Sequence, residues 1–294
     1  MISRPRRIAF QGEPGANSHI ACHDVYPDYE AMACPTFEDA FQAVSTGTAA
    51  LGMIPIENSI AGRVADIHHL LPSSGLHIVG EYFLPVHYSL VAPKGATLDT
   101  VRKVRSHPQA LGQCRNRLRQ HGFEAEIGAD TAGSARQVAE MNDPTYAALA
   151  PRLAAEVYGL EILGQNWEDE DHNTTRFVVL SSDKAWAARG IGPVVTSFVF
   201  RVRNVPAALY KAMGGFATNS VNMTKLESYQ LDGEFFATQF YADIEGHPED
   251  PNVMLAFEEL AFFSRQFDIL GVYRASPFRE QAAARARARE ASAG

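Results

Sequence analysis

Apolar runs and helical patterns follow one another in a regular order along most of this chain, and that order limits the folds it can adopt. From Arg7 to about Leu180, short apolar runs such as Ile8-Ala9-Phe10 alternate with helical patterns such as residues 18–25. Strands and helices in alternation predict a mostly parallel sheet with helices on its faces. Because 294 residues exceed one ordinary core, two domains are expected.

Two local patterns refine this prediction. Thr36, followed three residues later by an acidic residue, has the spacing of a capping box and predicts a helix that ends at Val44. Residues 77–91 contain two apolar runs separated only by Leu84-Pro85, which predicts a hinge between two lobes. We therefore expect an α/β domain over residues 6–183 with a cleft between its lobes. The first lobe is expected over about 6–84 plus 173–183, and the second over about 85–172.

The pattern changes after a linker at residues 184–194. The chain then reads as strand, helix, two strands, helix and strand, which is the βαββαβ order of a ferredoxin-like domain, expected over residues 195–275. The tail, 276–294, is rich in Ala, Arg and Glu and predicts a frayed helix to which we assign no function. The strands are expected at 196–203, 221–229, 234–244 and 269–273, with helices at 207–216 and 251–267 and a turn at 230–233.

Composition excludes several classes of function. A formal net charge of −8 argues against a nucleic-acid surface. No apolar run approaches the length of a membrane span, and none follows the N-terminal arginines as a signal peptide requires. Three scattered cysteines fit a reducing cytoplasm and neither a disulfide framework nor a zinc site. No nucleotide-binding glycine motif follows a strand, so we expect no nucleotide, metal or other cofactor. The cysteine pattern leads us to expect a cytoplasmic protein.

Polar clusters follow four of the predicted strands, where ligands of open α/β sheets bind. Each also has a structural interpretation: the glycine-rich 12–18 as a tight turn, and the other three as helix caps and surface turns. Helix-start amides after the first cluster are candidates for holding a carboxylate. The other three clusters are Glu57-Asn58-Ser59, Ser106-His107-Pro108-Gln109 with Gln113, and Asp130-Thr131-Ala132-Gly133-Ser134.

A fifth cluster, Asn173-Thr174-Thr175-Arg176, comes before its strand. Adjacent hydroxyls beside an arginine suit a substrate with a carboxylate, which a guanidinium grips with two hydrogen bonds. The structural alternative is a strand opened by β-branched residues, with Arg176 on the surface. Taken alone, each cluster is compatible with both interpretations.

Together the clusters resemble one family in order and spacing. Thr175-Arg176-Phe177 is similar to the TRF motif of prephenate dehydratases, and Pro55-Ile56-Glu57-Asn58-Ser59 to their PxENS-type segment. The segment 106–114 resembles their SHPxALxQC-type sequence, and 12–18 their opening glycine-rich segment. The resemblance runs from about Arg6 to Ala275, and the βαββαβ region is similar to the ACT domain of bacterial members.

The resemblance implies a catalytic domain like type II periplasmic binding proteins and conversion of prephenate to phenylpyruvate on the route to phenylalanine. It also implies feedback by phenylalanine and a homodimer or homotetramer through the ACT domain. By this resemblance the catalytic residues are Thr175, Glu57, Asn58, Ser106 and Gln113. The substrate-binding residues are Arg176, Ser59, Asn17, Ser18, Thr131 and Phe177, and the phenylalanine-binding residues are Ala208, Leu209, Asn219, Val221, Asn222, Leu226, Glu227 and Ser228.

Three alternatives stay open. The proton donor is Thr175 or Glu57, and we favour Thr175 as a hydrogen-bond donor because a free threonine is a very weak acid. Arogenate dehydratase and a non-catalytic sensor of aromatic metabolites are the alternative functions. The ACT-like region departs from the family at Pro206-Ala207-Ala208-Leu209 and Glu227-Ser228-Tyr229-Gln230, so an ACT domain that only dimerises is an alternative to feedback.

Overall fold

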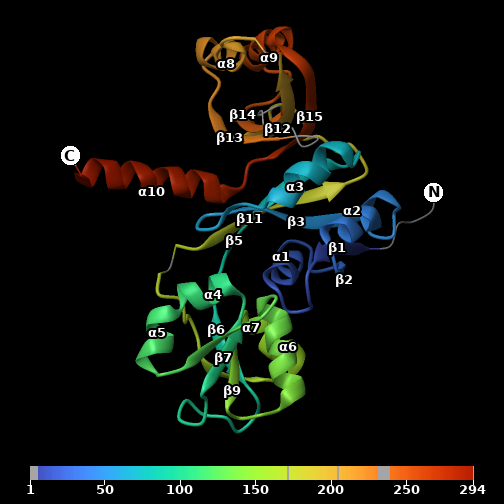
Figure 1. Ribbon diagram of the computed structural model, residues 1–294. Helices are drawn as coiled ribbons and strands as arrows, with labels where there is room; N and C mark the ends of the chain where they lie inside the picture. Colours follow the sequence, from blue (N-terminus) through green and yellow to red (C-terminus); the bar gives the residue numbers. More distant parts are fainter. Residues whose placement is uncertain (1–5, 171, 204, 231–238, 294) are drawn as a thin grey trace. The chain divides into compact units, whose positions relative to one another are not determined.

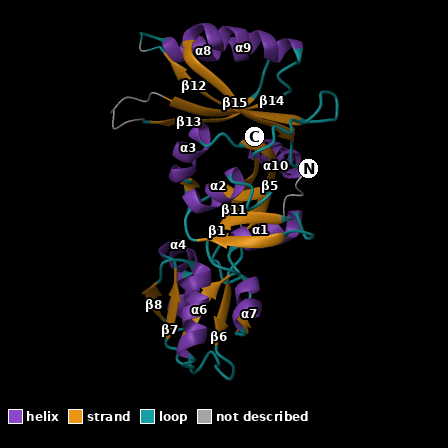
Figure 2. Ribbon diagram, turned by 90° about the vertical axis from the view of Figure 1, so that its right-hand side faces the viewer, coloured by secondary structure: helices purple, strands orange, loops and turns teal. Residues whose placement is uncertain are grey.

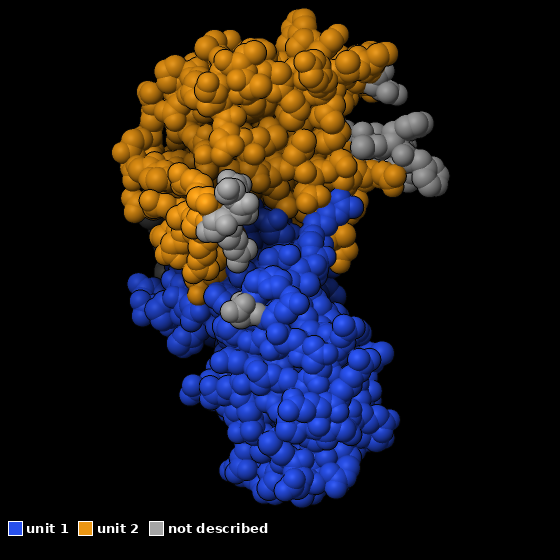
Figure 3. Space-filling model, turned by 90° about the vertical axis from the view of Figure 1, so that its left-hand side faces the viewer, with its two compact units in different colours: residues 1–64, 84–177 blue, residues 65–83, 178–294 orange. Residues whose placement is uncertain are grey.

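The computed structural model describes residues 6–170, 172–203, 205–230 and 239–293. These residues form two compact units, coloured separately in Figure 3: unit 1 comprises residues 1–64 and 84–177, and unit 2 comprises residues 65–83 and 178–294. The chain passes between the units three times: between Val64 and Ala65, within β5 (His77–Pro85) and within β11 (Thr174–Ser181). The predicted α/β class is confirmed, and each unit is described separately.

In the first part of unit 1, strand β1 pairs parallel with β2 on one side and with β3 on the other, as predicted, whereas the two-residue strand β4 pairs antiparallel with β3. Ile8 and Ala9 of β1 are fully buried, which explains the apolar run at residues 8–10. The capping box predicted at Thr36 is present: its hydroxyl accepts a hydrogen bond from Asp39 N, and the Asp39 carboxylate accepts one from Thr36 N. The elements here are β1 (Arg7–Gln11), α1 (Asn17–Val25), β2 (Glu30–Cys34), α2 (Phe37–Ser45), β3 (Leu51–Asn58) and β4 (Gly62–Arg63).

The second sheet of unit 1 has the strand order β10-β6-β9-β7-β8 and is mixed; Figure 1 labels its strands β6, β7 and β9. β7 is parallel to β8 and β9, whereas β6 runs antiparallel to β9 and β10. The prediction of a mostly parallel sheet is wrong here, because two of the four strand pairings in this sheet, β6 with β9 and β6 with β10, are antiparallel. The elements are β6 (Ser89–Ala92), β7 (Lys103–Ser106), α4 (Pro108–Gln113), α5 (Arg115–Gln120), β8 (Glu124–Ile127), α6 (Thr131–Met141), β9 (Tyr146–Ala150), α7 (Arg152–Tyr158) and β10 (Glu161–Gly164).

Unit 2 contains the predicted βαββαβ region. Its antiparallel strands follow the order β13-β14-β12-β15, and β5 lies parallel beside β15. α8 and α9 lie together on one face of this sheet (Figures 1 and 2), over a core rich in phenylalanine. The elements of unit 2 are α3 (Ala65–Leu70), the 3-10 helix η1 (Leu71–Ser73), β12 (Val194–Val202), α8 (Ala208–Thr218), β13 (Met223–Tyr229), β14 (Gln239–Glu245), α9 (Pro251–Phe263), β15 (Ser264–Arg274) and α10 (Pro277–Ala293).

Two predicted elements differ from the structure. The helical pattern of residues 109–120 predicts one helix, but the structure interrupts it at Cys114, which separates α4 from α5. α9 ends at Phe263, and residues 264–267 begin β15 instead, where Gln266 and Phe267 pair with β12. Sheet pairing therefore outweighs the local helical pattern at this point. The turn expected at 230–233 and the start of the strand expected at 234 fall largely on 231–238, outside the described residues.

Candidate active site

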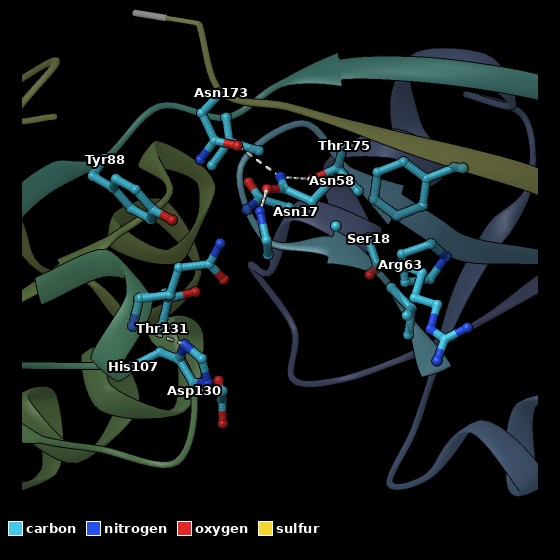
Figure 4. Close-up of a pocket in the computed structure, with 17 residues that line it drawn as sticks. Asn17, Ser18, Asn58, Arg63, Tyr88, His107, Asp130, Thr131, Asn173 and Thr175 are labelled. Carbon is cyan, nitrogen blue, oxygen red and sulfur yellow. Dashed lines mark hydrogen bonds between the residues drawn. The ribbon is translucent and has the colours of Figure 1, made fainter. Parts of the chain in front are cut away.

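A pocket of about 280 Å³ lies within unit 1 (Figure 4). Its lining comes from both parts of the unit. Residues 17–64 contribute the start of α1, the end of β3 and the turn to β4, and residues 86–177 contribute the rest. Six predicted site residues line it: Asn17, Ser18, Asn58, Thr131, Thr175 and Phe177. The lining also includes Arg63, Tyr88, His107, Gln109, Asp130 and Asn173, which the sequence analysis did not select as site residues.

Asn58 organises one wall of this pocket with both ends of its amide. Its Oδ1 accepts hydrogen bonds from Ile60 N at 3.0 Å and Ala61 N at 2.9 Å, which closes the turn between β3 and β4. Its Nδ2 donates to Asn173 Oδ1 at 2.6 Å and to Thr175 Oγ1 at 3.0 Å. The two backbone donors fix which end of the amide is the oxygen. Consequently the Thr175 hydroxyl receives a hydrogen bond and keeps its own hydrogen for another acceptor.

Asn173 continues this chain of amides. It is 3% exposed, and its Nδ2 donates to Gln113 Oε1 at 2.8 Å. Tyr88 lies beside the Asn173 side chain, and burial raises the pKa of the Tyr88 phenol, so that it stays protonated at neutral pH. The backbone of Tyr88 is fixed by Glu168, whose carboxylate accepts from Tyr88 N at 2.9 Å. Asn173 is thus a buried connection between the Gln113 helix and the Asn58 turn.

Arg176 does not line the pocket, in contrast to the two residues beside it. In a β-strand successive side chains point to opposite faces, so when Thr175 and Phe177 face the pocket Arg176 points away. Its side chain is 2% exposed, and its Nη1 donates to Glu57 Oε1 at 2.9 Å. Glu57 is likewise absent from the described lining. The two predicted charged residues of the site therefore contact each other.

Two predicted hydroxyl residues connect strands and turns rather than face the pocket. Ser106 is fully buried in β7, and its Oγ donates to Leu149 O of β9 at 2.6 Å. Ser59 donates from its Oγ to His172 O at 2.9 Å and accepts from Thr174 N at 2.9 Å. These bonds hold the β3–β4 turn against the segment that leads into β11.

Helix starts supply the remaining polar lining. Asn17 and Ser18 begin α1 after Gly15, whose φ of +89° suits glycine. Asp130 is the N-cap of α6, where its Oδ1 accepts from Gly133 N at 2.7 Å, and His107 caps α4 by accepting from Gln109 N at 3.3 Å. The capping interpretation of these two segments is therefore confirmed, although both residues also line the pocket.

The residues predicted to bind phenylalanine lie in unit 2. Ala208 and Val221 are buried, whereas Leu226 on the edge strand β13 is exposed. Unit 2 also contains a larger cavity of about 710 Å³, lined by residues such as His247, Arg274 and Arg287, and none of the eight predicted residues is among the described residues that line it. The predicted residues are Ala208 and Leu209 on α8, Asn219, Val221 and Asn222 after it, and Leu226, Glu227 and Ser228 on β13.

Other features bear on the kinds of site that the chain offers. Cys22, Cys34 and Cys114 are free and buried. Among the described residues no group of three or more His, Cys, Asp or Glu side chains is arranged to hold a metal ion. In the same part of the chain, none of the helices has the length and apolar character that crossing a membrane requires.

Comparisons with known proteins agree on one family. The family model described as "Prephenate dehydratase" matches residues 8–185. A protein of Komagataeibacter europaeus described as a bifunctional N-acyl-homoserine lactone acylase/prephenate dehydratase is 50% identical, over 94% of this chain and 98% of its own length. The chloroplastic arogenate dehydratase/prephenate dehydratase 2 of Arabidopsis thaliana is 36% identical, over 91% of this chain and 72% of its own length.

Solved structures agree with these matches. A prephenate dehydratase from Arthrobacter aurescens in complex with L-Phe is similar with a TM-score of 0.83 and 28% identity, covering 98% of this chain and all of that chain. A structure described as a quorum-quenching acylase has a TM-score of 0.87 and 50% identity, covering 92% of this chain and 99% of that one. The likeness thus extends over both units.

Proposed function

The chain belongs to the prephenate dehydratase family, and from that premise we propose that it converts prephenate to phenylpyruvate, with the pocket of unit 1 as its active site. The observation that carries this proposal is the hydrogen bond from Asn58 Nδ2 to Thr175 Oγ1. A hydroxyl that already accepts an amide hydrogen directs its own hydrogen to a different acceptor. The departing ring hydroxyl of prephenate is an acceptor of the required kind.

The reaction needs little else from the protein. The bond between the ring and its carboxylate breaks, carbon dioxide leaves, and that electron pair aromatises the ring as the opposite carbon–oxygen bond breaks. The departing hydroxide takes up a proton from the solvent and leaves as water. We assign Thr175 as the donor that stabilises the negative charge developing on the departing oxygen. Asn58, Asn173 and Gln113 act by holding that donor in place.

We propose different roles for the other predicted residues. Glu57 is engaged by the Arg176 guanidinium, so we favour Thr175 over Glu57 as the donor to the leaving group. Arg176 and Ser106 are then positioning residues. Arg176 holds Glu57 at the end of β3, and Ser106 holds β7 against β9. Asn17, Ser18 and Thr131 offer polar groups to the substrate at the starts of α1 and α6. Phe177 offers an apolar surface for the ring, and Ser59 supports the Asn58 turn.

The experiment that tests this proposal is direct. The purified protein is incubated with prephenate, and phenylpyruvate is measured by its absorbance in alkali. We expect turnover in the wild type and a large loss in Thr175→Ala. Arogenate is assayed in parallel, because the plant relatives carry both substrates in their names. Turnover of arogenate alone would identify an arogenate dehydratase, and binding of either compound without product would indicate a sensor.

The name of one relative suggests a second activity for this chain. The Komagataeibacter europaeus relative is named for N-acyl-homoserine lactone acylase as well as prephenate dehydratase, at 50% identity over nearly the whole chain. We therefore propose hydrolysis of the N-acyl amide as a candidate second function. The test follows release of homoserine lactone by chromatography, with the wild type and Thr175→Ala compared to learn whether the two activities share a pocket.

For residues 195–275, which lie in unit 2, we propose an ACT domain that binds phenylalanine and mediates a homodimer or homotetramer. We place the catalytic domain at 6–183 and the ACT domain at 195–275. Support comes from the βαββαβ order, from the exposed edge strand β13 and from the relative solved with L-Phe. Calorimetric titration of the full chain with phenylalanine, tyrosine and tryptophan tests the effector, and light scattering tests the oligomer. An ACT domain that only dimerises would bind none of the three.

A further inference from the structure

Positive charge in the described lining of the unit 1 pocket comes from an arginine. Among the described residues that line it, Arg63 is the only lysine or arginine. Asp130 is the only carboxylate in that described lining, and its charge faces the N-terminus of α6, where it accepts from Gly133 N. Arg176, which the sequence analysis favoured as the carboxylate ligand, is bound to Glu57 behind the strand. A substrate with two carboxylates therefore meets positive side-chain charge in this lining at Arg63.

The position of Arg63 is set by the same residue that holds Thr175. The Asn58 carboxamide oxygen closes the turn through Ile60 N and Ala61 N, and Gly62 then takes a φ of +80°, which brings the chain back beside β3. Arg63 pairs in register with Glu57, and Val64 N donates to Ile56 O at 3.0 Å.

One amide thus contacts the hydroxyl donor with its nitrogen and shapes the turn to Arg63 with its oxygen. The Arg63 backbone follows that turn by a few residues, so its position relative to Asn58 is defined by short-range geometry, and Asn58 in turn contacts Thr175. Figure 4 shows Asn58, Thr175 and Arg63 among the residues that line the pocket.

We propose that the Arg63 guanidinium binds a carboxylate of the substrate and gives the pocket its preference for a doubly negative molecule. This inference rests on the proposed function and names a substrate-binding residue for it. A guanidinium binds a carboxylate through two parallel hydrogen bonds, which fixes orientation as well as charge. Arogenate has the two carboxylates of prephenate but also an ammonium group, so the net attraction to Arg63 is weaker for arogenate.

The test compares Arg63→Gln, Arg63→Lys and a control, Arg119→Gln, which removes an exposed arginine from α5 outside the described lining. We expect Arg63→Gln to raise KM for prephenate by about 10- to 100-fold, the range for a lost hydrogen bond to a charged group. We expect kcat to change less than fivefold. Arg63→Lys should recover part of the loss because it keeps the charge, and the control should match the wild type.

Two further readouts separate this inference from the proposed function. The ratio of kcat/KM for prephenate to that for arogenate should fall in Arg63→Gln, and the KM of the wild type should rise with salt more steeply than that of the variant. An unchanged KM in a folded Arg63→Gln protein, or an equal loss for both substrates, would overturn the role of Arg63. Absence of phenylpyruvate from the wild type would instead overturn the proposed function.

Discussion

Asn58 Nδ2 lies 3.0 Å from Thr175 Oγ1 and donates a hydrogen bond to it, although 117 residues separate the two in sequence. The same amide nitrogen contacts Asn173, and the amide oxygen closes the β3–β4 turn. Loss of this side chain therefore affects a hydroxyl, a buried amide and a turn at once. Substitutions at Asn58 can separate these effects.

Asn58→Asp removes the amide donor but keeps the oxygen that accepts from Ile60 N and Ala61 N. We expect the turn to survive and kcat to fall about 100-fold or more, because Thr175 loses the bond that orients it. Asn58→Ala should lose similar activity and also cost about 1–2 kcal/mol of unfolding free energy for the lost turn bonds. Phenylpyruvate assays and urea denaturation measure the two effects. A kcat within threefold of wild type in Asn58→Asp would contradict the proposed orientation.

Thr175 and Thr174 offer a matched pair on one strand. Thr175→Ala removes the hydroxyl in the pocket and should lower kcat by about 10²- to 10³-fold, whereas Thr175→Ser should keep most of the activity. Thr174→Ala is the control, since the bonds of Thr174 to residue 59 use its backbone. Comparable losses in Thr174→Ala and Thr175→Ala would indicate damage to β11 rather than loss of a donor.

Gly15 is required by a close approach as well as by its backbone conformation. Its φ is +89°, and an added Cβ would lie 2.6 Å from Ala154 Cα, whereas Gly122 has a similar φ of +69° with open space around it. We expect Gly122→Ala to cost about 1–2 kcal/mol of unfolding free energy from backbone strain alone. Gly15→Ala should cost about 1–3 kcal/mol more from overpacking and also raise KM, because Asn17 and Ser18 follow it. Equal losses in the two variants would mean that the Ala154 contact relaxes freely.

Arg279 of α10 joins two fully buried carboxylates within unit 2. Its guanidinium donates to both Glu81 oxygens, at 2.7 and 2.9 Å, and lies 3.8 Å from Asp243 Oδ2. Removing one partner from a buried ion pair is costly, so Arg279→Met should lower the unfolding free energy by about 3–5 kcal/mol. The double variant Arg279→Met/Glu81→Gln should recover part of this loss. If the losses of unfolding free energy in the two single variants simply add up in the double variant, as measured by denaturant unfolding, Arg279 and Glu81 are not coupled.

Burial raises the pKa of the Cys22 thiol to about 12, from 9.0. The thiol therefore stays protonated at pH 8, and we expect alkylation of Cys22 by iodoacetamide to be far slower in the folded protein than in urea. The sign for stability follows from linkage. Between about pH 9 and 12 the unfolded chain has lost this proton while the folded chain retains it, so unfolding free energy falls as pH rises, by about 1.4 kcal/mol per unit. Mass spectrometry of the modified peptide and urea titrations at several pH values check both effects.

Local patterns predicted the elements well because their causes are local. The capping box at Thr36 needs only neighbouring residues, and the alternation of strands and helices predicted the α/β class. The predictions failed where distant strands decided the outcome. Residues 264–267 have a helical pattern but pair with β12, and β6 runs antiparallel in a sheet expected to be mostly parallel.

For the site, the order of residues is enough to place Thr175 and Phe177 on one face of a strand and Arg176 on the other. Which of the two faces meets the pocket depends on how the chain folds. The contacts that decide it, Asn58 with Thr175 and Arg176 with Glu57, join segments more than a hundred residues apart. Side-chain alternation is a property of one strand, whereas the environment of each face depends on the other segments that fold against it.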